Sequence, residues 1–220
     1  HHHGRSQFEG GGRPEWGCTL KPMANSKLDR LLTEIRACRI CEKHLPLGPR
    51  PVLRARRSAR VLIIGQAPGT KVHESGIPWD DRSGDRLREW LAIGHDTFYN
   101  HRQVAIVPMG FCYPGRDKNG GDNPPRPECA PEWHPKVVPA LAGVQLTLLV
   151  GSYAQAHYLA DRRSRTMTET VRRWREFLPD YLPTPHPSWR TTGWARKNPW
   201  FESELVPELR TRVAAALSTD

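Results

Sequence analysis

The chain has 220 residues, of which 37% are hydrophobic and 25% are charged, a balance that is typical of a globular domain and excludes wholesale disorder. Its 33 basic residues outnumber its 23 acidic residues, which gives a formal net charge of +10. No run of about 18 apolar residues occurs, and no apolar segment follows the basic start. We therefore expect no membrane span, no secretory signal, a cytoplasmic location in a bacterium, and an anionic partner such as nucleic acid.

The beginning of the chain differs in character from the rest. Three histidines open a Gly-rich stretch, so we expect residues 1–22 to be an expression tag and linker, followed by a single domain over residues 23–220. The stretch holds three basic and two acidic residues, so the expected domain keeps a charge of +9. Setting aside Cys18 leaves four cysteines, and an even set in an unsecreted chain indicates a metal or cluster site before disulfides.

The expected domain opens with a helical pattern. Ser26 can cap this helix, Asp29 stands three residues later, and an apolar stripe of leucine and isoleucine ends at Cys38. A connector rich in proline and arginine over residues 45–60 then breaks the pattern. The first strand is expected to follow directly after this connector.

Short apolar runs alternate with helical patterns in the remainder of the chain. The runs predict buried strands at 61–64, 104–107, 146–150 and 181–184, and helices are predicted at 85–91, 152–159 and 169–177. Residues 109–139 hold seven prolines and several glycines, so we expect a loop with little regular structure there. The alternation of strands and helices predicts an α/β fold with a parallel sheet.

In a parallel sheet, ligands bind where the loops leave the carboxyl ends of the strands. The unusual residues of this chain stand at those places: residues 65–69, 108–112, 151–152 and 186–188. Taken alone, the first of these loops is compatible with a tight turn without chemistry, since it has neither dinucleotide-binding glycine spacing nor a phosphate-loop Gly-Lys-Ser/Thr. The four loops together indicate a site.

The loop that begins at His186 carries the most chemistry. Pro185 and Pro187 restrict its backbone, and Ser188, Trp189 and Arg190 follow. A rigid loop that presents a histidine, a hydroxyl, an aromatic ring and a cation suits a protein acting on nucleic acid, with the imidazole on a leaving group, the hydroxyl on a phosphate and the ring in the base stack. A solvated surface loop is the alternative interpretation.

Three motifs in this order resemble the uracil-DNA glycosylase superfamily. The segment Gly65-Gln66-Ala67-Pro68-Gly69 is similar to the first motif of family four, with Gln in place of Glu, and Asp81-Arg82-Ser83-Gly84-Asp85 is similar to family five. The third motif is His186-Pro187-Ser188, and the resemblance extends over residues 31–201. It implies a three-layer α/β/α fold around a mainly parallel four-stranded sheet, and a monomeric repair enzyme that flips uracil out of DNA and hydrolyses its N-glycosidic bond, leaving an abasic site.

The resemblance also implies a cofactor. Families four and five carry a [4Fe-4S] cluster on a Cys-x2-Cys pair ahead of the first strand and on a later pair about sixteen residues apart. Cys38 and Cys41 match the first pair, and Cys112 and Cys129 match the second. Zinc on the same four cysteines, zinc on Cys38, Cys41 and His44, and four buried thiols without a metal are the alternatives.

The same resemblance assigns roles in the site. His186 is expected to donate a hydrogen bond to the uracil oxygen as negative charge develops there, and Asp81 or Asp80 to stabilise the sugar cation and orient water, with Asp81 favoured. A helix N-cap pair or two solvated loop acids is the alternative for these carboxylates. Trp79 is expected to stack on uracil, or else to be a core aromatic. The remaining expected residues are Gly65, Gln66, Ala67, Pro68, Met109 and Gly110 around the base, and Ser152, Ser188, Trp189 and Arg190 on DNA, with Arg190 as the wedge.

Two departures from the superfamily pattern put the substrate range in question. Ala67 stands where family one has an aspartate, and Pro108 stands where family four has an asparagine that reads the uracil edge, with no other asparagine close by in the sequence. Base discrimination is then expected from Gln66, from main-chain groups near Met109 and Gly110, or from pocket shape. Hypoxanthine and xanthine become alternative substrates, a catalytically weak nucleic-acid-binding module is an alternative function, and an iron–sulfur or zinc scaffold is a third.

Overall fold

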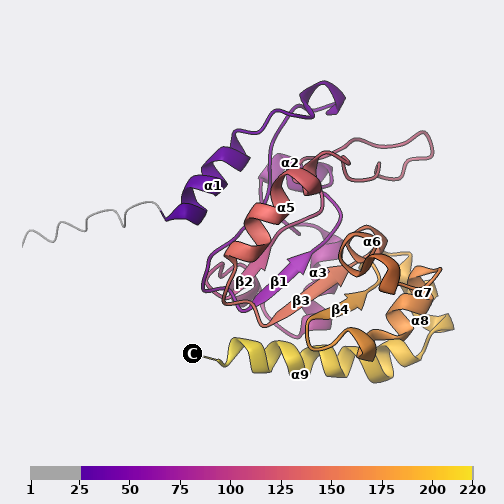
Figure 1. Ribbon diagram of the computed structural model, residues 1–220. Helices are drawn as coiled ribbons and strands as arrows, with labels where there is room; N and C mark the ends of the chain where they lie inside the picture. The colour runs from indigo at the N-terminus through magenta and orange to yellow at the C-terminus, as the bar shows by residue number, and fades with distance from the viewer. Residues whose placement is uncertain (1–25, 220) are drawn as a thin grey trace, which may run out of the picture.

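The computed structural model describes residues 26–219 (Figure 1). The expected tag at residues 1–22 lies outside the described residues. Four parallel strands form the sheet in the order β2-β1-β3-β4. Their bounds are β1 (Val61–Ile64), β2 (Val104–Ile106), β3 (Leu146–Val150) and β4 (Tyr181–Thr184). No helix in this part of the chain is long and apolar enough to cross a membrane.

Helices precede, connect and follow these strands. Short 3-10 turns are η1 (Glu42–His44), η2 (Ala160–Arg162) and η3 (Trp174–Phe177), and a π-helical turn is η4 (Phe201–Leu205). The α-helices are α1 (Lys27–Arg36), α2 (Thr70–Ser75), α3 (Arg82–Leu91), α4 (His95–Phe98), α5 (Cys129–Ala140), α6 (Ser152–Leu159), α7 (Met167–Arg172), α8 (Thr191–Lys197) and α9 (Val206–Leu217).

Two hydrophobic cores lie on opposite faces of the sheet. Leu62 and Ile64 pack into the core shared with α1 and α5, whereas Val61 and Ile63 pack into the core shared with α3 and α9. Figure 1 shows α5 and α9 on opposite sides of the strands. This arrangement confirms the three-layer α/β/α fold, and it explains why the strands read as uninterrupted apolar runs, since both of their faces are covered.

The strand predictions agree closely with the structure. β1, β3 and β4 have the predicted bounds, and β2 ends one residue before the predicted end at Val107. The amide of Val107 still donates to the carbonyl oxygen of Ile63 at 3.0 Å. The predicted capping of α1 is also confirmed, because the Asp29 amide donates to Ser26 Oγ at 3.1 Å and the Ser26 amide donates to Asp29 Oδ2 at 3.4 Å.

One loop prediction and two helix predictions need correction. The expected loop at 109–139 contains α5, whose prolines at 131, 135 and 139 are four residues apart and so share one side of the helix, while Trp133 and Val137 are buried on another. Burial of that apolar side outweighs the missing amide donors. The predicted helix at 85–91 begins earlier as α3, and the one at 169–177 is split into α7 and the 3-10 turn η3.

Candidate active site

A cleft opens at the carboxyl ends of β1 and β2. Its volume is about 750 Å³ when the open mouth is included. The loops after β1 and β4 meet here, as expected for a parallel sheet. The predicted residues that line the cleft are Gly65, Gln66, Ala67, Pro68, Trp79, Asp81 and His186.

The indole of Trp79 lies between the first loop and His186. A β-carbon at position 65 would come within 2.8 Å of Trp79 Cζ2, so the ring can approach this closely only because residue 65 is glycine. The centroids of the Trp79 and His186 rings are 5.6 Å apart with an interplanar angle of 33°. The half-buried indole therefore forms a wall of the cleft next to the imidazole.

The backbone of Trp79 is in the left-handed region, with φ at 60°. A bulky residue in this region costs about 1–3 kcal/mol and persists only where its surroundings impose it. Tyr99 Oη donates to the carbonyl oxygen of Pro78 at 2.8 Å, and Arg88 Nη1 donates to that of Trp79 at 3.2 Å. Arg88 also donates to Tyr99 Oη at 3.1 Å. Arg88 of α3 and Tyr99, the residue after α4, therefore hold the turn that carries the indole in place.

His186 is held through its main chain. Its carbonyl oxygen accepts hydrogen bonds from the Ser188 amide at 2.9 Å and from the Thr191 hydroxyl. The imidazole itself makes no hydrogen bond with any residue from 26 to 219. Burial lowers the pKa of His186, and the negative charge of Asp81 opposes this effect without overcoming it. The imidazole is therefore neutral at neutral pH and keeps an N–H group available for a ligand.

The structure separates the two predicted carboxylates. Asp81 caps α3, because its Oδ1 accepts from the Gly84 amide at 2.8 Å, and it also lines the cleft. Asp80 is exposed and does not line the cleft. Asp81 is therefore an N-cap residue, as the alternative interpretation states, and it is also part of the site.

Two cleft residues carried no signal in the sequence. Asp122 and Asn123 reach the cleft from the long loop between β2 and α5. Asn123 Nδ2 donates to the carbonyl oxygens of Pro114 at 3.2 Å and Arg116 at 3.4 Å, which folds this loop back over the site. Partial burial raises the pKa of Asp122, with Arg116 opposing and the charge of Asp81 adding to the rise. An asparagine is thus present in the cleft, although it lies fifteen positions after Pro108 in the sequence.

Met109 and Gly110 are not brought to the cleft. Met109 is buried in the core on the α5 side, and Gly110 lines a different cavity. Their amides donate to the carbonyl oxygens of Gly65 at 2.9 Å and Gln66 at 2.8 Å. These amides are therefore engaged in joining the first two loops, and Pro108 is the part of this segment that lines the cleft.

His134 of α5 contacts the main chain of Pro108. Its Nε2 lies 2.8 Å from the Pro108 carbonyl oxygen and its Nδ1 lies 2.5 Å from Tyr158 Oη. A carbonyl can only accept, so Nε2 carries the proton and Nδ1 accepts from the tyrosine. Burial lowers the pKa of His134 to about 4, which is consistent with this neutral tautomer.

The residues expected on DNA do not line the cleft, but Ser188, Trp189 and Arg190 lie within four positions of His186 in the chain. Trp189 is 77% exposed, and the Arg190 guanidinium lies 5.5 Å from the centre of its ring. The carbonyl oxygen of Ser188 accepts from Arg86 Nη1 at 2.9 Å, which ties this loop to α3. Ser152 is exposed at the start of α6, directly after Gly151, whose missing side chain leaves room for Gln66.

The four expected ligand cysteines line one cavity on the α5 side, together with Phe111 and Trp133. The Phe111 amide donates to Cys129 Sγ at 3.4 Å, and Cys41 Sγ lies 3.3 Å from Glu128 Oε2. Within residues 26–219, no group of three or more His, Cys, Asp or Glu side chains is placed to hold one metal ion. Four thiols around a mainly apolar cavity with an amide donor to sulfur nevertheless fit an iron–sulfur cluster, which is larger than a single ion.

Three of the four thiols, those of Cys41, Cys112 and Cys129, are protonated when no metal is bound. Burial raises the pKa of Cys129 to about 12, and burial followed by the Glu128 carboxylate raises that of Cys41 to about 11. Burial also raises the pKa of Cys112. Binding of iron would have to displace these protons, as it does for thiolate ligands in general.

Comparison with protein families agrees with this geometry. Residues 54–210 match the Uracil DNA glycosylase superfamily. The matched region runs from just before β1 into α9 and includes every element that contributes to the cleft. The chain therefore belongs to the uracil DNA glycosylase superfamily, and its activity is of the DNA glycosylase type, a hydrolase of DNA repair.

Proposed function

We propose that this protein removes uracil from DNA by hydrolysing the N-glycosidic bond and leaves an abasic site. The observation that carries the proposal is the convergence of His186, Trp79 and Asp81 in one cleft, with the exposed Trp189 three residues from the histidine. A ring to stack on a base, a neutral donor and a carboxylate are the parts that this reaction needs. Among residues 26–219 no lysine lines the cleft, and the proposed reaction is simple hydrolysis without a Schiff-base step.

Cleavage of the bond leaves negative charge on the departing uracil. The neutral imidazole of His186 donates to the uracil oxygen as this charge forms, and removing a donor of this kind typically costs a factor of about 10²–10³ in rate. Trp79 stacks on the base and holds it against that donor. Because the His186 carbonyl is fixed by two hydrogen bonds, the imidazole is positioned before the substrate binds.

Positive charge develops on the sugar in the same step. Asp81 is the acidic residue shared by the expected set and the cleft, and we assign it to stabilise this cation and to orient the attacking water. The cap that Asp81 makes to Gly84 engages Oδ1, and the carboxylate has a second oxygen for this role. We assign Asn123 to the edge of the base through its Oδ1, which can accept from a base N–H, because its Nδ2 already donates to the Pro114 and Arg116 carbonyl oxygens.

Access to the base requires extrusion from the duplex, which costs a few kcal/mol of stacking and pairing. Trp189 is an exposed aromatic three residues after His186, and we assign it with Arg190 to fill the gap in the duplex. Ser152 and Ser188 are assigned to the phosphates on either side. This places every DNA contact of the proposal at the carboxyl edge of the sheet.

We further propose a [4Fe-4S] cluster on Cys38, Cys41, Cys112 and Cys129. The support is that all four thiols line one cavity and that the Phe111 amide donates to Cys129 Sγ. When bound, the cluster would supply a structural cross-link between the end of α1, the loop after β2 and the start of α5. The residues of this chain perform the proposed hydrolysis without it.

The proposal is tested with labelled oligonucleotides that carry uracil, hypoxanthine, xanthine or a G·T mismatch, followed by alkaline cleavage. Strand breaks at uracil, abolished in a His186→Ala variant, are expected. Breaks at several bases would extend the substrate range to other deaminated bases. Retained DNA binding without breaks at any base would contradict the proposal and favour a binding module on the same fold.

A further inference from the structure

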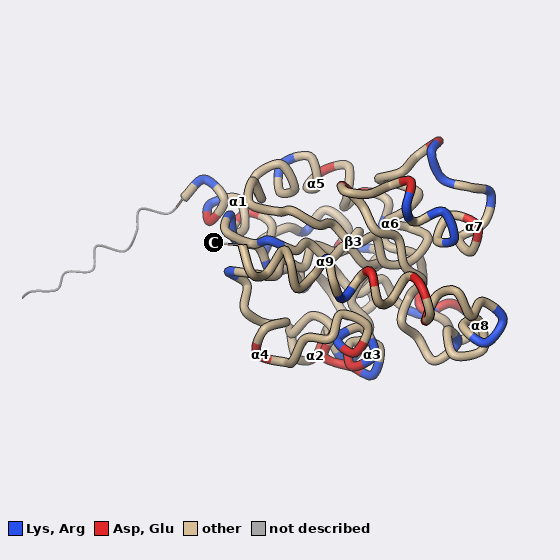
Figure 2. Tube along the Cα trace, turned by 90° about the horizontal axis from the view of Figure 1, so that it is seen from below, with Lys and Arg blue, Asp and Glu red and all other residues tan. Residues whose placement is uncertain are grey.

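A second basic region lies beyond the cleft, around α7 and α8. Residues 160–200 contain nine basic and four acidic residues. The net charge of this stretch is therefore +5, which is half of the net charge of the chain. In Figure 2, Lys and Arg gather around α7 and at α8. Eight exposed cations of this stretch form no ion pair within residues 26–219, and we call six of them the α7–α8 surface: Arg163, Arg165, Arg172, Arg175, Arg196 and Lys197.

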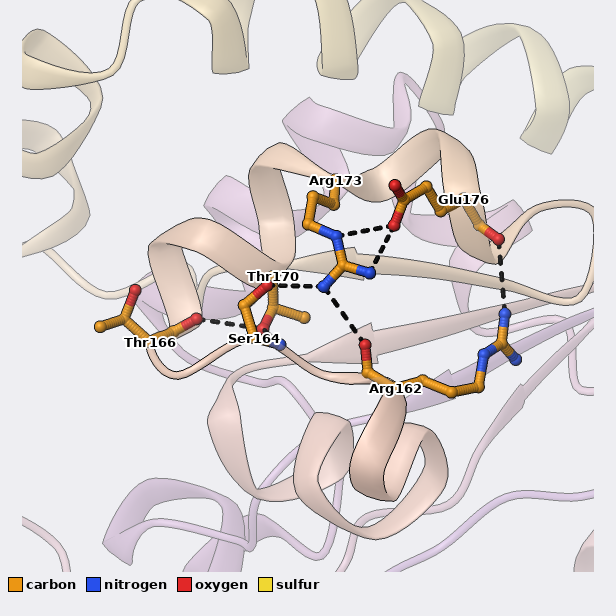
Figure 3. Close-up of polar contacts among 6 residues, drawn as sticks. All are labelled: Arg162, Ser164, Thr166, Thr170, Arg173 and Glu176. Atoms are coloured by element: carbon orange, nitrogen blue, oxygen red, sulfur yellow. Dashed lines mark hydrogen bonds and ion pairs between the residues drawn. The ribbon is translucent and has the colours of Figure 1, made fainter.

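The loop that carries Arg163 and Arg165 is rigidly built. The guanidinium of Arg173 donates to the Glu176 carboxylate at 2.6 Å, to Ser164 Oγ at 2.6 Å and to the Arg162 carbonyl oxygen at 3.3 Å (Figure 3). The hydroxyl of Thr170 accepts from the Ser164 amide at 2.9 Å. These bonds pair Arg173 with Glu176, whereas the side chains of Arg163 and Arg165 have no partner within residues 26–219.

Aromatic rings support two further cations of the surface. The Arg175 guanidinium lies 4.1 Å from the centre of the Trp174 ring, and that of Arg172 lies 5.4 Å from the Trp200 ring. Stacking of this kind restricts the side chain while leaving the guanidinium edge open to an anion. The entropy that these side chains lose on binding is therefore smaller than for free arginines.

The surface adjoins Trp189 and Arg190, which are proposed to contact DNA, because α8 follows these residues in the chain. Trp194 Nε1 of α8 donates to Thr168 Oγ1 of α7 at 2.8 Å, which joins the two helices. Arg190, which follows the exposed Trp189, is the N-cap residue of α8. Figure 1 shows α7 and α8 together at the end of the molecule beyond β4. A duplex centred on the cleft can therefore extend over these helices.

We propose that the α7–α8 surface binds the phosphate backbone of duplex DNA on one side of the extruded nucleotide. The inference rests on the proposed function for the position of the duplex. The guanidinium group can donate two parallel hydrogen bonds to phosphate oxygens. Arginines without an internal partner therefore add affinity for the DNA backbone, and such contacts do not depend on the base sequence. The surface thus makes the enzyme bind flanking duplex, so that a longer substrate is held more tightly than a short one.

The test uses the double variant Arg163→Gln/Arg165→Gln. The matched control is Arg56→Gln/Arg57→Gln, which removes two exposed arginines from the turn that precedes the amino end of β1. Affinity for an undamaged duplex is measured against salt concentration. Each lost phosphate contact should reduce the slope of log K against log salt by about 0.9 in the first variant. The control should keep the wild-type slope.

Equal slopes in the two variants, whether both unchanged or both reduced, would overturn the inference. Loss of binding to an acidic polypeptide such as polyglutamate, with duplex binding intact, would assign the surface to a protein partner and would overturn it as well. Because binding is measured on undamaged DNA, this outcome is separate from the proposed function. The latter fails if wild-type protein cleaves at no modified base, whatever the salt slopes are.

Discussion

The carbonyl oxygen of Trp79 lies 1.7 Å from the position that a β-carbon at residue 84 would occupy. Trp79 can hold its left-handed backbone against α3 only because residue 84 is glycine. A Gly84→Ala substitution must therefore displace the turn that presents the indole to the cleft. We expect it to lower the free energy of unfolding by about 1–3 kcal/mol and to reduce uracil excision, measured by chemical denaturation and single-turnover cleavage.

A matched control for this prediction is Gly193→Ala. Gly193 also lies in a helix, but a β-carbon there would meet nothing within 4 Å. Alanine should stabilise that helix by about 0.5–1 kcal/mol and leave excision unchanged. If both variants were as stable and as active as wild type, the close approach of Trp79 to Gly84 would not matter for the site.

The adjacent acids Asp81 and Asp80 provide a second matched pair. Asp81→Asn keeps the cap of α3, since an amide oxygen can accept from Gly84, but it removes the charge that faces His186. We expect single-turnover excision to fall at least about tenfold, as for loss of a stabilising group in other enzymes. Because the Asp81 charge raises the pKa of His186, its removal should lower that pKa, measured by NMR titration of the imidazole. Asp80→Asn should change neither quantity, and an equal fall in both variants would remove Asp81 from the mechanism.

The sequence predicts the sheet well and the cleft in part, for physical reasons that particular residues illustrate. Strands such as Val61–Ile64 are buried on both faces, so their composition alone identifies them. The loops after the strands follow from the parallel topology, which is why His186 and Gln66 were expected to meet. Helix α5 was missed because its prolines dominate the local pattern, whereas the burial of Trp133 and Val137 decides the outcome.

Other site residues cannot be derived from local sequence. Asp80 and Asp81 are neighbours, and only the point at which α3 begins turns one toward the cleft and leaves the other exposed. Asn123 reaches the cleft through a loop closed by hydrogen bonds to Pro114 and Arg116. Such long-range placement depends on how the loop folds against the sheet, so neither spacing nor composition indicates it.

Removal of one proposed cluster ligand provides a third prediction. Protein purified without oxygen should contain iron and show visible sulfur-to-iron absorption, and Cys129→Ser should lose both and unfold more readily, because a structural metal contributes to the free energy of unfolding. Cys18→Ser, in the expected tag, is the control and should retain the iron. A wild-type protein that contains no iron, or that contains zinc in its place, would contradict the cluster.

His134 provides a fourth prediction, on the pH dependence of stability. Its pKa is about 4 in the folded protein, below the ordinary value of about 6.5, because burial disfavours the imidazolium. The unfolded chain therefore binds more protons at this residue between those two values, and the free energy of unfolding should fall as the pH is lowered from about 6.5 to about 4. The shift corresponds to a loss of roughly 3 kcal/mol.

In a His134→Gln variant this loss should be absent, so its free energy of unfolding, measured by urea denaturation at several pH values, should decline less steeply than that of the wild type over the same interval. The Gln amide can still donate toward the Pro108 carbonyl, which limits the damage to the cleft. His157→Gln is the matched control, because His157 lies beside His134 with its ring centroid 5.9 Å away but is itself exposed. It should keep nearly the wild-type slope. An unchanged slope in His134→Gln would show that this imidazole is not held neutral between Pro108 and Tyr158.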